Sequence, residues 1–162
     1  MVSGFTKVPL ITYAFSWEKG IMAYSALDVA KYVINYELSQ DRSVTNLRLQ
    51  KLLYFVQAKV LMETGEPCFN DEMQAWEYGP VVPVVYHAYA EYRNFSIQKQ
   101  EYESEIAQNI KAYIKDILNY FANTETFELV QITHCQKPWI EAREKGNRQP
   151  ISIDAIREYF KD

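Results

Sequence analysis

Two histidines, His87 and His134, are the side chains best suited to act as a base near neutral pH, and they stand far apart in the chain. Neither lies in a His-Glu-x-x-His motif, and the sequence has no Gly-x-Ser-x-Gly motif or phosphate-binding glycine loop. Cys68 and Cys135 show no zinc-site spacing, so we expect both to be small buried side chains. We therefore expect no catalytic residue, no cofactor and no metal. A metal-dependent enzyme with a site near His134 stays as an alternative.

Tyrosine and arginine side chains form a second candidate site, for binding rather than catalysis. Tyr86, Tyr89 and Arg93 follow one another at three- and four-residue spacing, which places them on one part of a predicted helix. Tyr78 precedes them at a bend, where its hydroxyl can point to solvent. Tyrosine and arginine are enriched among the residues that dominate protein interfaces, so we predict that these four residues contact a partner. The alternative is ordinary helix packing with the hydroxyls at the surface.

A proline-rich connector positions this candidate face. Gly79-Pro80 and Val82-Pro83 restrict the backbone to extended geometry, so neither pair can lie inside a helix or a central strand. Pro83 can begin a helix, because the first helical position needs no N–H donor. Trp76 and Trp139 each lie beside such a proline turn, and we predict that both anchor irregular backbone to the core.

Helical periodicity dominates the chain from residue 25 onward. Ser25 and Asp28 have the spacing of a capping box, and the apolar stripe that follows Thr45 ends at Gly65, before a proline. Residues 68–77 lose this period and predict one or two short strands around an Asn-Asp turn at residues 70–71. The predicted helices cover residues 25–38, 45–65, 83–93, 104–123, 125–133, 138–146 and a last one capped by Ser152.

These elements predict a mainly α, compact single-domain fold of six to seven helices, with a short extended or β-hairpin insert around residues 68–82. The chain has 162 residues, 48% of them hydrophobic, which is enough for a core without disulfides or metals. Residues 1–22 lack the later periodicity and are predicted to be an N-terminal extension, so that the domain covers 23–162.

Charge and hydropathy narrow the classes of partner. The formal charge of −4 opposes binding to a phosphate backbone, so no direct contact with nucleic acid is expected and a DNA-binding regulator is the weaker alternative. No stretch is apolar for long enough to span a bilayer, and no signal peptide is recognisable, so no membrane partner is expected. Two cysteines in a domain of this size fit a reducing cytoplasm.

Several of these segments together resemble one known family. The segments are Leu49-Gln50-Lys51-Leu52-Leu53-Tyr54-Phe55-Val56-Gln57-Ala58, Gly65-Glu66-Pro67 with Phe69, Ala75-Trp76-Glu77-Tyr78-Gly79-Pro80-Val81-Val82-Pro83, Ile132-Thr133-His134 and Pro138-Trp139. They are similar to the SocA-like antitoxin family, also called the phage-associated GepA or Panacea domain. The resemblance implies a structural role for Leu52, Tyr54, Phe55, Trp76, Gly79, Pro80, Pro83, Thr133, His134, Pro138 and Trp139.

The resemblance also implies a function. Members are mostly helical domains of bacterial and phage toxin–antitoxin pairs, and they neutralise a neighbouring toxin by direct binding. We accordingly expect a non-enzymatic antitoxin whose partner is a protein toxin encoded next to it. Some members act as adaptors that present the toxin to a protease, which remains an alternative. Others carry an added DNA-binding domain, for which this chain has no room beyond its N-terminal extension.

Overall fold

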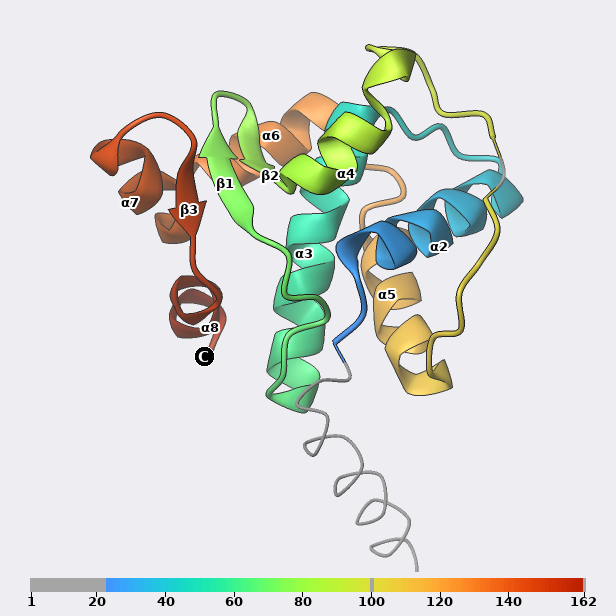
Figure 1. Cartoon of the computed structure of the whole chain (residues 1–162), viewed down its shortest axis with the longest axis horizontal. Coiled ribbons are helices and arrows are strands. Elements are labelled where there is room, and N and C mark those ends of the chain that lie inside the picture. The colour runs from blue at the N-terminus through green and yellow to red at the C-terminus, as the bar shows by residue number, and fades with distance from the viewer. Residues whose placement is uncertain (1–22, 100, 162) are drawn as a thin grey trace, which may run out of the picture.

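Helix α3 (Asn46–Thr64) lies at the centre of the molecule, and the other elements pack around it (Figure 1). The computed structural model describes residues 23–99 and 101–161, so the predicted N-terminal extension, residues 1–22, lies outside the described residues. The other described helices are α2 (Ala26–Ser39), α4 (Pro83–Ala88), the 3-10 helix η1 (Ala90–Tyr92), α5 (Gln108–Tyr120), α6 (Thr126–His134), α7 (Lys137–Lys145) and α8 (Ile153–Phe160). The strands are β1 (Met73–Trp76), β2 (Gly79–Val81) and β3 (Gln149–Ile151).

The arrangement has two sides. Helices α2 and α5 pack on one side of α3, and the sheet with α7 and α8 lies on the other (Figure 1). Seven α-helices and one small sheet in the described residues confirm the mainly α prediction. No described helix is both long enough and apolar enough to cross a membrane.

The central helix begins and ends where the sequence predicts. The Thr45 hydroxyl accepts a hydrogen bond from the Arg48 amide at 3.2 Å, and Gly65 ends the helix with a left-handed φ of +81°. Helix α2 begins after Ser25, whose hydroxyl accepts from the Asp28 amide at 3.0 Å. Fourteen of the nineteen residues of α3 are buried, so the fold surrounds this helix on nearly every face.

The predicted insert is a β-hairpin that belongs to a three-stranded antiparallel sheet. The strand order is β2-β1-β3, with Gln74 opposite Val81 in one pair and Pro150 in the other. Pro80 and Pro150 both lie in edge strands, where a missing N–H is tolerated. The predicted Asn-Asp turn is wrong, because the chain turns at residues 77–78. Asp71 instead accepts a hydrogen bond from the Ala26 amide at 2.8 Å.

Two predicted helix boundaries are also wrong. The helix that begins at Pro83 ends at Ala88 and not at Arg93, and η1 follows it. Helix α5 begins after Ala107 and not after Ser104. Long-range bonds hold the residues before it: the Asn35 side chain bonds both backbone groups of Glu101, each at 2.8 Å, and the Tyr24 hydroxyl accepts from the Ala107 amide at 3.0 Å.

Helices α6 and α7 lie within two residues of their predicted bounds. Ser152 caps α8 as predicted, because its hydroxyl accepts from the Ala155 amide at 3.0 Å. Strand β3 was not predicted. Its three residues carry no alternating pattern, and Pro150 in the middle argues against a strand.

Candidate functional site

Polar side chains of α3 hold the hairpin in place. The Gln50 side-chain oxygen accepts a hydrogen bond from the Val82 amide at 2.8 Å. The next residue, Lys51, donates from its ammonium group to the Pro80 carbonyl. Both α3 side chains are at most 1% exposed. Because a buried polar group without a partner is costly, each of them fixes the backbone that it bonds.

Two further α3 side chains extend this row at either end. The Asn46 side-chain amide donates to the Tyr86 carbonyl at 3.0 Å and so holds helix α4. The Gln57 side chain accepts from the Cys68 amide and donates to the Phe69 carbonyl, each at 2.7 Å. Side chains of α3 therefore hold the segment from residue 68 to residue 86 at its start, at residues 68–69, and again at residues 80–86.

Gly79 allows strand β2 to approach α3 and α6 very closely. Its φ is +113°, and a Cβ added there would lie 2.8 Å from the Thr133 hydroxyl oxygen and 2.9 Å from Cε of Lys51. Thr133 and Lys51 are both fully buried. Burial lowers the pKa of Lys51 to about 7, because the charged form has lost its water.

The motif pieces around Trp76 and Trp139 meet at the hairpin turn. The Trp139 indole N–H donates to the Trp76 carbonyl at 2.8 Å. The His134 ring stacks on Trp139 with centroids 4.0 Å apart, and its Nε2 lies 3.1 Å from the Glu77 carbonyl oxygen. Burial lowers the pKa of His134, and the nearby Lys51 charge acts in the same direction. The two tryptophans thus connect the hairpin to α7.

The remaining motif residues lie in the core or at helix starts. Leu52 is fully buried, and Phe55 is 6% exposed. The Tyr54 hydroxyl donates to the Gln136 side-chain oxygen at 2.7 Å, and burial raises the pKa of Tyr54. Pro83 and Pro138 stand in the first turns of α4 and α7, where prolines are tolerated.

A groove of about 610 Å³ opens beside the hairpin turn and brings most of the predicted contact residues together. Tyr78 is 51% exposed at the turn, Tyr86 lies on α4, and Arg93 is exposed just after η1. Trp76 lines the groove beside Tyr86, and their rings meet edge to face with centroids 5.0 Å apart. Tyr89 does not line the groove; it is 4% exposed and belongs to the core. The other lining residues are Asn46, Leu47, Gln50, Glu77, Val81, Ala90, Asn94, Arg143, Asn147 and Arg148.

Two arginines in this groove were missed by the sequence analysis. The Arg148 guanidinium lies 3.8 Å from the centroid of the Trp76 ring, and Arg143 lies 5.7 Å from that of Trp139. Both are cation–π contacts. Together with Arg93 they place three guanidinium groups around one concave surface, and Glu77 is the acidic residue among the lining side chains.

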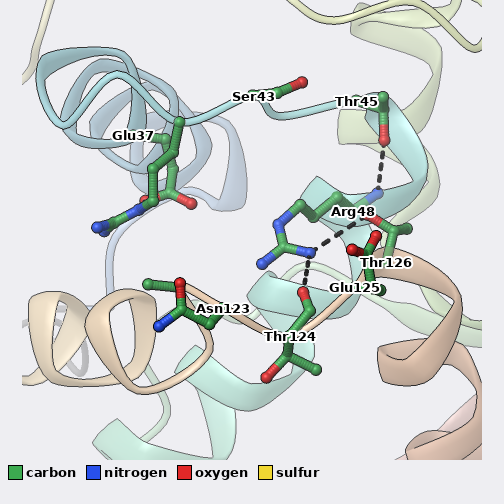
Figure 2. A pocket seen from close by; sticks show the side chains of 10 residues that line it. Glu37, Ser43, Thr45, Arg48, Asn123, Thr124, Glu125 and Thr126 are labelled. Carbon is green, nitrogen blue, oxygen red and sulfur yellow. Dashed lines mark hydrogen bonds and ion pairs between the residues drawn. The ribbon is translucent and has the colours of Figure 1, made fainter.

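A second pocket, of about 440 Å³, lies between the end of α2, the start of α3 and the connection from α5 to α6 (Figure 2). Arg48 extends into it and donates to the Thr124 carbonyl at 2.7 Å (Figure 2). The same guanidinium donates to the Phe121 carbonyl at 2.8 Å. Burial lowers the pKa of Arg48. Glu37 is fully buried, and one of its oxygens accepts from Arg42 at 3.0 Å. The Arg48 bonds hold the α5–α6 connection to the start of α3.

The candidate catalytic residues are not brought together. In residues 23–99 and 101–161, no three His, Cys, Asp or Glu side chains gather in a way that could hold a metal ion. His87 is exposed on α4. Cys68 is buried, and burial raises its pKa to about 12, whereas Cys135 is exposed rather than buried as predicted.

The motif segments described above all lie within the match to one protein family. The family model described as "Antitoxin SocA-like, Panacea domain" matches residues 49–140, more than half of the chain. The chain belongs to this antitoxin family. It is also similar to Antitoxin SocA of Caulobacter vibrioides (strain NA1000 / CB15N), with 29% identity over 148 residues that cover 83% of this chain and 79% of that protein. No solved structure matches it.

The Panacea-domain match divides the groove into two parts. The matched residues run from the first turn of α3 into α7 and include the hairpin, α4 and the aromatic pair Trp76 and Tyr86. They also include Arg93. Arg143 and Arg148 follow the last matched residue, at the end of α7 and before β3.

Proposed function

We propose that this Panacea-domain protein is a cytoplasmic antitoxin that neutralises a cognate toxin by binding it directly, with no catalysis of its own. The toxin is the protein encoded next to it, and the groove beside the hairpin turn is the contact surface. Membership of the antitoxin family supports the class of function. The observation that carries the site is the meeting of Trp76, Tyr78, Tyr86 and Arg93 in one groove.

The mounting of these side chains favours a role in binding. The Tyr86 backbone is held by Asn46, and its ring packs on Trp76, which is itself held by Trp139 through its carbonyl. A side chain that is already held in place loses little conformational entropy when a partner binds. Tyrosine, tryptophan and arginine are also the residues that most often dominate interface energies. A standard interface of about 1,600 Å² would extend beyond the groove onto the surfaces around it.

The first test of this proposal is genetic. Expression of the adjacent gene alone should arrest growth, and co-expression of this chain should restore it. A harmless neighbour, or failed rescue while both proteins are soluble, would contradict the proposed function.

The second test places the contact surface. Tyr78→Ala should weaken toxin binding by about tenfold or more, as expected for an exposed interface anchor, with little change in melting temperature. Tyr120→Ala is the matched control, because Tyr120 is 78% exposed on α5 and does not line the groove. Equal affinities for the two variants would place the binding surface elsewhere.

A further inference from the structure

The three groove arginines form no ion pair and no side-chain hydrogen bond among the described residues, although Arg143 and Arg148 each contact a tryptophan ring. The chain has six arginines. Arg42 and Arg157 form ion pairs with carboxylates at 2.9 and 2.7 Å, and Arg48 donates to carbonyls inside the second pocket. The other three all line the groove.

Arg93, Arg143 and Arg148 have no carboxylate within 4.0 Å among the described residues. This separation occurs in a chain with 21 acidic and 17 basic residues, where carboxylates are in excess. The positive charge of the groove is therefore opposite in sign to the net charge of the chain. We infer that the groove receives an acidic segment of the toxin, with its carboxylates at these three arginines and its apolar side chains on Trp76 and Tyr86. The inference rests on the proposed function and names the chemistry of its partner.

The geometry of Arg148 suits it to bind a carboxylate. Its guanidinium carbon lies 3.8 Å from the centroid of the Trp76 ring, and its N–H groups form no hydrogen bond with another described residue, so they can donate to a partner. A carboxylate can accept two such N–H groups at once. The Arg148 backbone amide donates to the Ala75 carbonyl at 3.1 Å, so the Arg148 backbone is fixed to strand β1.

Backbone conformation singles out two of the same residues. Arg93 and Arg148 have φ values of +54° and +53°, and among described residues other than glycine only Asp41 also has a positive φ. Such conformations are unfavourable for side chains with a Cβ and gather at functional sites. Here two of these three residues line the same groove.

The groove favours a protein segment over a nucleic acid. Nucleic-acid surfaces need broad clusters of Lys and Arg, and this chain has a net charge of −4 and three arginines at the site. The mixture of guanidinium groups with Val81, Trp76 and Tyr86 fits a peptide in which acidic and apolar side chains alternate. A single-stranded oligonucleotide is kept as a competing outcome of the test, because arginine and aromatic residues also bind stacked bases.

The experiment uses the full chain and the purified product of the adjacent gene. Affinity is measured at about 50 and about 300 mM salt for the wild type, for Arg93→Gln, Arg143→Gln and Arg148→Gln, and for the triple variant. Each single change should weaken binding by about tenfold, the value of one charged hydrogen bond, and the wild-type affinity should fall with salt. Arg148→Lys keeps the charge but loses the planar fork, so it should lie between wild type and Arg148→Gln.

Arg157→Gln is the matched control, because it removes the same charge from α8, outside the groove. It should leave affinity unchanged. Melting curves show whether each variant is folded; if the triple variant is not, the single variants and the salt titration decide the result.

The outcomes separate the two proposals. A wild-type complex that forms but is insensitive to salt and to all three arginine changes, while Tyr78→Ala weakens it, would overturn the acidic-segment inference and leave the antitoxin proposal standing. No wild-type complex at either salt would overturn both. Binding of a single-stranded oligothymidylate that disappears in the arginine variants, with the toxin complex unchanged, would also overturn the inference.

Discussion

Gly79→Ala should destabilise the fold more than any other glycine-to-alanine change in the described chain. The methyl group would lie 2.8 Å from the Thr133 hydroxyl oxygen and 2.9 Å from Cε of Lys51. Neither neighbour can easily move, because both residues are fully buried and the Lys51 ammonium group is bonded to the Pro80 carbonyl. The φ of +113° adds a second cost, since a residue with a Cβ rarely adopts it.

The two costs have separate magnitudes. A backbone held in such a conformation costs about 1–3 kcal/mol. Extra volume forced into a packed site costs about 1–3 kcal/mol. The unfolding free energy should therefore fall by about 4 kcal/mol, which corresponds to about 8–16 °C in melting temperature for a chain of this length.

Gly65→Ala is a matched control that isolates the backbone term. Gly65 also has a positive φ, +81°, but a Cβ there would meet nothing within 4 Å. Its replacement should cost about 1–2 kcal/mol. Urea and thermal unfolding of both variants, followed by circular dichroism, measure the difference. Equal losses for Gly79→Ala and Gly65→Ala would refute the close approach of β2 to α3 and α6.

A double-mutant cycle adds a sharper check. Thr133→Ala removes the nearest oxygen, and the hydroxyl that is lost donates only to the Val130 carbonyl within α6. The double variant with Gly79→Ala should therefore be more stable than the sum of the two single losses predicts. Simple additivity would show that the two residues do not touch.

Three further predictions concern buried or stacked side chains. Lys51→Met should flatten the pH dependence of the unfolding free energy. Burial lowers the pKa of Lys51 in the folded protein to about 7, against an ordinary value of 10.5, so between these two pH values the unfolded chain binds more protons than the folded one. The unfolding free energy of the wild type should therefore rise with pH across this range, by up to about 1.4 kcal/mol per pH unit. Urea titrations between these pH values check it, and parallel curves for both proteins would contradict it. Arg48→Met should cost about 3 kcal/mol in thermal unfolding, because two buried carbonyls lose a charged donor, and a loss under about 1 kcal/mol would be inconsistent with those bonds. His134→Ala should lower the melting temperature by a few degrees by removing its stack on Trp139, and should leave growth rescue intact; lost rescue with native melting would show a direct role.

Local signals in the sequence predicted most of the helices because each helix end depends on neighbouring residues. Ser25, Thr45 and Ser152 cap helices through their own hydroxyls, and Gly65 ends α3. Such signals act within about four residues, so a single sequence carries them fully. The helix start predicted at Ser104 was wrong because residues far away in the chain bind this segment: Asn35 bonds the backbone of Glu101, and the Tyr24 hydroxyl accepts from the Ala107 amide.

The same distinction between local and long-range signals applies to the candidate site. Tyr78, Tyr86 and Arg93 are close in sequence, and their shared position beside the proline connector was predictable. Arg148 reaches Trp76 only because β3 pairs with β1, and β3 is a three-residue strand with a central proline. Tyr89 was predicted on the same helix face as Tyr86 but is buried in the core. Helical periodicity predicts which residues share a face, but it does not show which part of that face a neighbouring element covers.

The polar residues of α3 explain why stability and binding should be connected in this protein. A helix that is buried on nearly every face would ordinarily be apolar. Gln50 and Lys51 are nevertheless buried polar residues of α3, and both bond the backbone of the hairpin segment. Those bonds fix the strand that precedes Tyr86 and follows Tyr78. A Gln50→Leu variant would keep the volume but leave the Val82 amide without its partner, so it should loosen the hairpin before the whole domain unfolds. Toxin affinity, measured beside thermal unfolding, should then fall more than the melting temperature does, because hairpin residues such as Trp76 and Tyr78 line the groove, whereas the core keeps its many other contacts.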